Sequence, residues 1–144
     1  MSHHDQGHAT KKSVIERYFN ELFNEGKVEL VSSLLHPNYV NRSPGSPDLP
    51  TGRDGVPIVV KALRAAFPDL HYTVEGLVIG EDAVAVRCRM RGTHEGDLFG
   101  TPPTHRAIDV MQMTIERFEG DQIIEHHRLT DEMTMMRQLG LAGS

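Results

Sequence analysis

The chain has 144 residues, 38% of them hydrophobic and 24% charged, which fits one globular domain and excludes a disordered protein. Its formal net charge of −5 disfavours a nucleic-acid partner, because phosphates require a net basic surface. No apolar run approaches the ~20 residues of a membrane span, and the single Cys88 fits a reducing compartment. We therefore expect a cytoplasmic protein with no membrane partner.

The first part of the chain has a helical pattern. Residues 1–12 are polar and His-rich, and we expect a disordered tail there, ahead of a single domain over residues 13–144. From the start of that domain, apolar residues recur at three- and four-residue steps, which predicts a helix that Gly26 ends. A shorter amphipathic helix is expected over residues 28–35, closed by Pro37.

A loop and a third helix follow. Residues 42–55, "RSPGSPDLPTGRDG", contain three prolines and three glycines and are expected to form a loop. Pro57 suits the first turn of a third helix, and Pro68 stops it.

After Pro68 the hydrophobic period changes from helical to alternating. The stretches "LHYTVEGLVI", "AVAVRCRMRG", "AIDVMQMTIERF" and "QIIEHHRLT" each predict a strand, and tight turns join them in hairpins. Asp131 is placed to cap a last helix, which Gly140 ends. Helices followed by hairpins indicate an α+β fold, with three N-terminal helices on a curved antiparallel sheet and an internal pocket between them.

Three arginines alternate with apolar residues in "VAVRCRMRG". Arg87, Arg89 and Arg91 therefore share one face of a strand. A solvated face, or one paired with neighbouring strands, explains them better than a phosphate track, because aromatic residues for base stacking are missing from this stretch.

Four stretches carry a resemblance to a known family: "YFNELFNEGKVELVSSLLHPNYVN", "GRDGVPIVVKALRAAFPDLHYTVEGLV", "RGTHEGDLFGTPPTHR" and the terminal "RQLG". Together they resemble the SnoaL-like polyketide cyclases, members of the nuclear-transport-factor-like superfamily of cone-shaped α+β domains. The resemblance runs from about Val14 to Gly140. It implies an intramolecular aldol cyclisation of a methyl ester, without metal or organic cofactor.

The resemblance also implies a set of site residues. The family's proton-transferring aspartate, on the final strand, falls on Arg128, and a family histidine two residues earlier matches His126. A pocket glutamine matches Gln112, a pocket histidine falls on Thr114, and a loop asparagine matches Asn41. The frame of the pocket is therefore expected to be kept while its central acid is replaced.

An arginine cannot act as a proton shuttle, because its guanidinium stays protonated at any working pH. It can still hold an enolate or a carboxylate oxygen. His126 shares its strand face with Arg128 and is the expected acid/base, although a structural hydrogen bond in the sheet explains it equally well. Glu125 and His127 belong to the opposite face. Asp131 is a further substrate-binding candidate whose position also suits a helix cap.

Two classes of function remain open. The first is an enzyme that binds a small hydrophobic carbonyl compound and catalyses cyclisation or isomerisation, with His126 and Arg128 as its catalytic residues. A variant of it resembles the epoxide hydrolases of the same superfamily and needs a carboxylate beside Arg128. The second is a non-catalytic ligand-binding or interaction module, which the loss of the aspartate favours.

The spacing of residues bears on two further expectations, a metal site and a dimer. His94, His126 and Asp131 lack the spacing of a metal-binding motif, so no metal is expected. Met111, Met113 and Ile115 alternate with Gln112 and Thr114, which puts apolar residues on both faces of one strand. A homodimer through the outer face of the sheet is expected.

Overall fold

The N-terminal helix carries much of the core. The computed structural model describes residues 3–142, so the first two residues of the expected tail and the last two of the expected domain lie outside the described residues. Helix α1 (His3–Arg17) runs directly into the π-helical turn η1 (Tyr18–Phe23), and Gly26 follows it at φ 74°. Ile15, Phe19 and Leu22 are almost completely buried along this stretch.

The helix begins earlier than the sequence indicates. Residues 3–12 form its first turns, where a disordered tail is expected. The Thr10 hydroxyl donates to the Gln6 carbonyl oxygen at 2.9 Å, and Lys12 lies 3.9 Å from Glu16. Polar residues can continue a helix that is already nucleated by a packed apolar stripe, because each added residue gains a backbone hydrogen bond.

The segment after α1 contains a strand that the sequence pattern does not reveal. A 3-10 turn η2 (Val28–Leu30) and a single helical turn α2 (Val31–Leu34) lead into strand β1 (Leu35–Asn41). β1 pairs in parallel with the last strand at three positions only, and its register shifts between them. Pro37 is tolerated there because β1 is an edge strand of the sheet.

The remaining elements follow the expected order. Helix α3 (Gly55–Ala66) precedes four antiparallel strands and a short helix: β2 (His71–Ile79), β3 (Ala83–Thr93), β4 (Ala107–Glu119), β5 (Gln122–Thr130) and α4 (Glu132–Gln138). The sheet order is β1-β5-β4-β3-β2. The expected α+β architecture is confirmed, except that the parallel β1 makes the sheet mixed.

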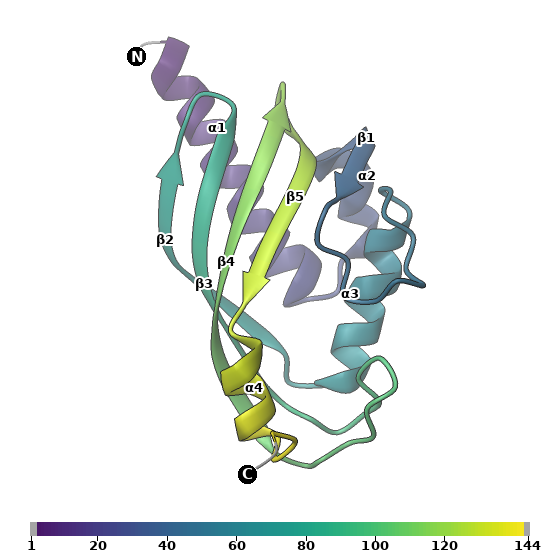
Figure 1. Cartoon of the computed structure of the whole chain (residues 1–144). Helices are drawn as coiled ribbons and strands as arrows, with labels where there is room; N and C mark the ends of the chain where they lie inside the picture. Colours follow the sequence, from purple (N-terminus) through teal and green to yellow (C-terminus); the bar gives the residue numbers. More distant parts are fainter. Residues whose placement is uncertain (1–2, 143–144) are drawn as a thin grey trace.

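The sheet curves over the helices, and strand β4 alternates between a buried and an exposed face. Figure 1 shows α1 and α3 on one side of the sheet and α4 at its end, beside the C-terminus. On β4 every second residue from Ile108 to Phe118 is buried. Each large apolar side chain on this inner face contributes ~1.5–3 kcal/mol to stability. None of the described helices is long and apolar enough to cross a membrane.

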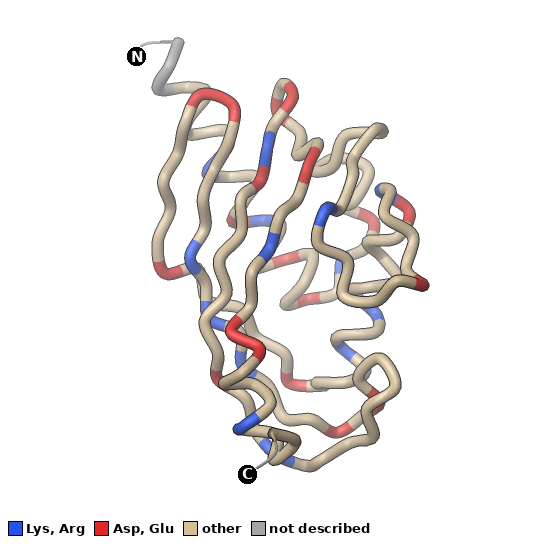
Figure 2. The backbone as a smooth tube through the Cα atoms, in the orientation of Figure 1, with Lys and Arg blue, Asp and Glu red and all other residues tan. Residues whose placement is uncertain are grey.

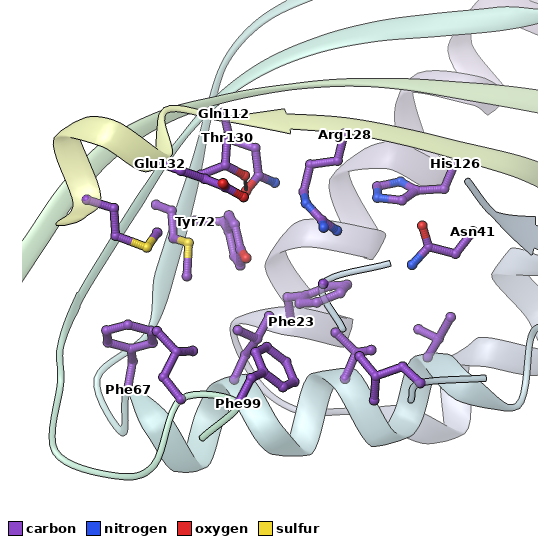
Figure 3. A pocket seen from close by; sticks show the side chains of 18 of the residues that line it. Phe23, Asn41, Phe67, Tyr72, Phe99, Gln112, His126, Arg128, Thr130 and Glu132 are labelled. Carbon is purple, nitrogen blue, oxygen red and sulfur yellow. Dashed lines mark hydrogen bonds between the residues drawn. The ribbon is translucent and has the colours of Figure 1, made fainter. Parts of the chain in front are cut away.

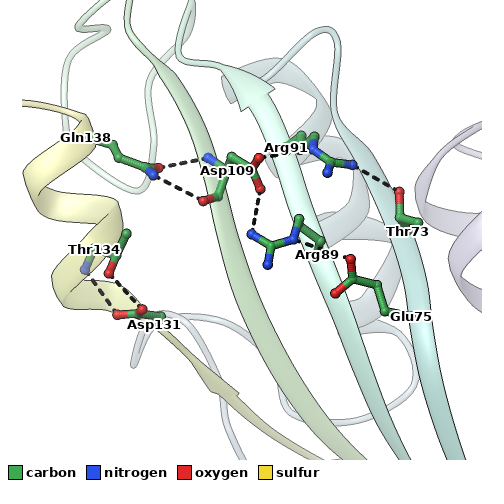
Figure 4. A network of polar contacts seen from close by, with 8 residues as sticks. All are labelled: Thr73, Glu75, Arg89, Arg91, Asp109, Asp131, Thr134 and Gln138. Carbon is green, nitrogen blue, oxygen red and sulfur yellow. Dashed lines mark hydrogen bonds and ion pairs between the residues drawn. The ribbon is translucent and has the colours of Figure 1, made fainter.

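The outer face of the sheet carries the three arginines. Arg89 lies 3.0 Å from Asp109 and 3.5 Å from Glu75, and Arg91 lies 3.3 Å from Asp109 (Figure 4). The Arg89 hydrogen bond holds the pKa of Asp109 below its ordinary value. The expected cross-strand pairing is confirmed for Arg89 and Arg91. Figure 2 shows acidic and basic positions interspersed along the whole chain.

Gly55 sits where helix α3 meets the preceding loop, and it has no room for a side chain. A Cβ there would lie 2.1 Å from the Pro50 carbonyl oxygen, whereas a Cβ on Gly52 meets nothing within 4 Å. We predict that Gly55→Ala lowers the free energy of unfolding by about 2 kcal/mol or more, because backbone must move. Gly52→Ala should change it by less than about 0.5 kcal/mol. Urea denaturation of both variants measures the difference, and equal midpoints would contradict the prediction.

Candidate active site

A cavity lies between the inner face of the sheet and the helices. Its volume is about 300 Å³, which suits a small organic molecule. Seven aromatic residues line it: Tyr18, Phe19, Phe23, Tyr39, Phe67, Tyr72 and Phe99. Asn41, Gln112, His126, Arg128, Thr130 and Glu132 add polar groups. The arrangement is an apolar enclosure with a few polar groups on one wall, which is typical of small-molecule sites.

His126 projects from β5 into this cavity and is held from behind by a carboxylate. Its Nδ1 lies 2.8 Å from both carboxylate oxygens of Glu116, which stands directly across from it on β4. Glu116 is fully buried and His126 is 4% exposed. Since Glu116 occupies Nδ1, the other ring nitrogen, Nε2, is the one available to a molecule in the cavity.

Arg128 projects beside His126, two residues further along β5 (Figure 3). The loop after β1 anchors it: its Nη2 donates to the Ser43 carbonyl oxygen, and its backbone N–H donates to the Ser43 hydroxyl at 2.9 Å. Within residues 6–142, no carboxylate oxygen lies within 4.0 Å of its guanidinium. Most of its five N–H donors are therefore open to a ligand.

Three tyrosines surround the guanidinium and stay neutral. Burial raises the pKa of Tyr18, Tyr39 and Tyr72 well above the ordinary value, and the charge of Arg128 offsets only part of that rise. Their hydroxyls therefore remain hydrogen-bond donors at physiological pH. They therefore do not neutralise Arg128 as phenolates.

Two uncharged amides complete the polar wall. Asn41 lines the cavity while its Oδ1 accepts from the Ser43 backbone N–H at 2.8 Å, so it serves both the turn and the pocket. The Gln112 Oε1 accepts from the Thr130 hydroxyl at 3.0 Å (Figure 3). That bond leaves the amide nitrogen of Gln112 as a donor, because a primary amide carries two N–H groups.

Of the six site residues expected from the sequence, four line the cavity and two do not. His126, Arg128, Asn41 and Gln112 come together around the cavity. Thr114 faces the inner side of the sheet, 3% exposed, but it is covered and does not line the cavity. Asp131 is exposed and accepts from the Thr134 backbone N–H at 3.1 Å and from its hydroxyl at 2.7 Å (Figure 4). Its carboxylate caps α4, because the first turn of a helix has unpaired N–H groups.

The residue that sequence reasoning missed is Glu116. It lies two positions after Thr114, so strand alternation places it on the same inner face as Gln112. The signal was present in the sequence, as a lone carboxylate within an otherwise apolar and uncharged stripe. A charged residue at such a position needs a buried partner, and only the pairing of β4 with β5 identifies that partner as His126.

Comparisons with known proteins agree on one family. The family model of the SnoaL-like polyketide cyclases matches residues 13–139. A nogalonic acid methyl ester cyclase of Streptomyces nogalater is 30% identical over 120 residues, covering 82% of this chain and 89% of that protein. An aklanonic acid methyl ester cyclase of Streptomyces galilaeus is 31% identical over 124 residues, covering 83% and 84%. The solved structure of TsrD from Streptomyces laurentii superposes with a TM-score of 0.84 at 25% identity, covering 93% of this chain and 97% of that one.

The cap geometry of Asp131 separates a structural role from a ligand-binding one. We predict that Asp131→Ala lowers the melting temperature by about 2–4 °C and leaves ligand affinity unchanged, because the carboxylate bonds the first turn of α4. Asp131→Asn should retain most of the stability, since asparagine is also a good cap. Thermal denaturation and a binding titration measure the two effects. A loss of affinity at full stability would assign Asp131 to the ligand instead.

Proposed function

The chain belongs to the SnoaL-like polyketide cyclase family, and from that premise we propose that it removes a proton next to a carbonyl group in a small, largely apolar polyketide-like compound. His126 is the base in this proposal, and Arg128 holds the oxygen that becomes negative. The observation that carries the proposal is the pair of polar side chains, one basic and one cationic, on the wall of an aromatic cavity. We also propose a cytoplasmic location, which the buried free thiol of Cys88 fits.

The proposed chemistry needs only transfers of protons and electron pairs. Nε2 of His126 takes the proton from the carbon, and the C–H electron pair moves onto the carbonyl oxygen as an enolate. The enolate carbon then attacks a second carbonyl of the same molecule, and its alkoxide oxygen takes the proton back from Nε2. No atom is lost, so the net reaction is an isomerisation that closes a ring.

Arg128 is suited to bind the negatively charged oxygen of the enolate. Its guanidinium is held in place by Ser43 before any ligand arrives, and preorganised donors stabilise developing charge most effectively in a site that excludes water. The neutral tyrosines and the apolar walls lower the local dielectric, which strengthens that interaction. Arg128 thus assists the reaction by stabilising the enolate charge, whereas the family's aspartate would assist it by proton transfer.

The same geometry bears on the hydrolytic alternative. Orientation of a water molecule by an arginine and a carboxylate requires that the two lie together, and the described part of the chain has no carboxylate within 4.0 Å of Arg128. Glu116 instead contacts His126. These contacts favour a histidine base over an epoxide-hydrolase-like arrangement.

The methyl esters named for the two relatives are the natural first substrates. We predict that the protein cyclises aklanonic or nogalonic acid methyl ester, and that His126→Ala lowers kcat at least about 100-fold, because general base catalysis contributes 10²–10⁴-fold. Chromatography with mass detection follows the cyclised product. Solvent deuterium incorporated at the reacting carbon reports proton removal even where ring closure fails.

His127→Ala is the matched control, since His127 is exposed on the opposite face of β5. It should leave kcat unchanged. Tight binding of both esters without turnover or deuterium incorporation would support the non-catalytic alternative. A His126→Ala variant that changes affinity alone would do the same.

We further propose that two copies associate through the outer face of the sheet. An outer apolar patch is formed there by Val78, Met113, Ile115 and Leu129, which are 50–78% exposed. The strand register makes it continuous, because Met113 lies opposite Leu129, and Ile115 and Val78 both lie opposite Ala85. An apolar sheet face of this kind supports a two-fold interface, where the same patch serves both subunits.

Leu129 is the most exposed residue of the outer apolar patch, at 78%. We predict that Leu129→Lys converts a dimer to a monomer, because an added charge in an apolar interface loses its hydration when the two copies associate. Light scattering at micromolar concentration measures the mass. Ile58→Lys, on helix α3 and 47% exposed, is the control that should stay dimeric. A monomeric wild type would contradict the proposal.

A further inference from the structure

We propose that Glu116 is a positioning residue, which fixes the tautomer and orientation of His126 so that the Nε2 lone pair faces the cavity. The role of His126 as a base rests on the proposed function, whereas its fixed tautomer is independent of that function. The β4–β5 pair would thus replace the family's single aspartate with a carboxylate–imidazole dyad.

Both carboxylate oxygens of Glu116 contact the same ring nitrogen of His126. Both oxygens lie 2.8 Å from Nδ1, and Glu116 has no other hydrogen-bond or ion-pair partner among the described residues. It is fully buried, so water does not solvate its charge. An isolated buried carboxylate is costly, and a hydrogen bond from His126 is what offsets that cost.

The chemistry of the two groups determines the direction of the hydrogen bond. An ionised carboxylate only accepts hydrogen bonds, so Nδ1 must donate and therefore carries the proton. A neutral imidazole has one proton, which leaves Nε2 with its lone pair. Nε2 is thus ready to take a proton from a molecule in the cavity. Once it has done so, the imidazolium lies beside the negative charge of Glu116, which stabilises it.

The other titratable groups around Glu116 do not compete for this role. Tyr18 from η1 and Tyr39 from β1 face it, and burial together with the Glu116 charge raises the pKa of both. Cys88 from β3 faces it too, and burial, with Glu116 adding, raises the pKa of that thiol to about 12. Arg128 from β5 stays cationic. The phenols and the thiol therefore keep their protons near neutral pH.

The chain contains a second Glu–His pair that serves as an internal control. On the outer face of β5, Glu125 accepts from His127 Nε2 at 2.7 Å, with Arg42 and Arg117 beside it. In this pair one carboxylate oxygen contacts Nε2, and the two residues flank His126 on β5. It differs in being open to solvent and in facing away from the cavity, so Glu125→Gln tests the substitution without the site.

The experiment compares Glu116→Gln and Glu125→Gln with the wild-type chain. Nitrogen-15 NMR of the histidine rings should show His126 protonated at Nδ1 in the wild type and in Glu125→Gln. In Glu116→Gln it should show a mixture of tautomers, because an amide can either donate or accept. On the methyl esters, Glu116→Gln should lower kcat at least about tenfold with KM changed less than about threefold. The acidic limb of its pH–rate profile should also move, whereas that of Glu125→Gln should not.

The two readouts separate the two proposals. A wild type that shows the Nε2 lone pair but converts neither ester overturns the proposed function and leaves the role of Glu116 in place. Turnover that is unchanged in Glu116→Gln overturns the role of Glu116. Should that variant fail to fold, the wild-type spectrum decides, because a proton on Nε2 with Nδ1 bare contradicts the assigned tautomer.

Discussion

The hydrogen bond between Glu116 and His126 is the constraint on which the site depends. It joins β4 to β5 through side chains, deep on the inner face, where neither side chain has another hydrogen-bond partner among the residues that the structure describes. Because the partners stand directly across from one another, their pairing also fixes the register of the two strands. A shift of β5 by one residue would turn His126 to the solvent face and leave Glu116 buried without its partner. The same contact thus supports the fold and orients the imidazole.

The position of Arg128 follows from that register. It lies on the same face as His126, and the loop after β1 holds it through Ser43 while Asn41 shapes the turn. The site therefore combines groups from distant parts of the chain, and the edge strand β1 is what carries the loop to β5. Replacement of an acid by a cation at this point separates two tasks. In the proposed mechanism, Arg128 stabilises the developing charge, and His126, held by Glu116, transfers the proton.

The inner face has to provide both a core and a site. On β4, Ile108 and Val110 belong to the hydrophobic core, whereas Gln112 lines the cavity together with His126 and Arg128 of β5. These polar groups can be buried because each has a hydrogen-bond partner: Glu116 pairs with His126, Gln112 with Thr130, and Arg128 with Ser43. Thr114, whose hydroxyl lacks one, is the exception within the described residues of β4.

Local pattern was enough for a large part of this result. Period-two alternation put His126 and Arg128 on one face and Glu125 and His127 on the other, and prolines and glycines delimited the helices, because both signals depend on neighbouring residues alone. Local sequence pattern predicted neither strand β1 nor the residue that pairs with His126. β1 has a helix-like apolar pattern and a proline, and it is a strand only because β5 offers an open edge. Glu116 becomes meaningful only once β4 and β5 are aligned, since a buried charge is defined by the group across from it, and that group is set by tertiary pairing.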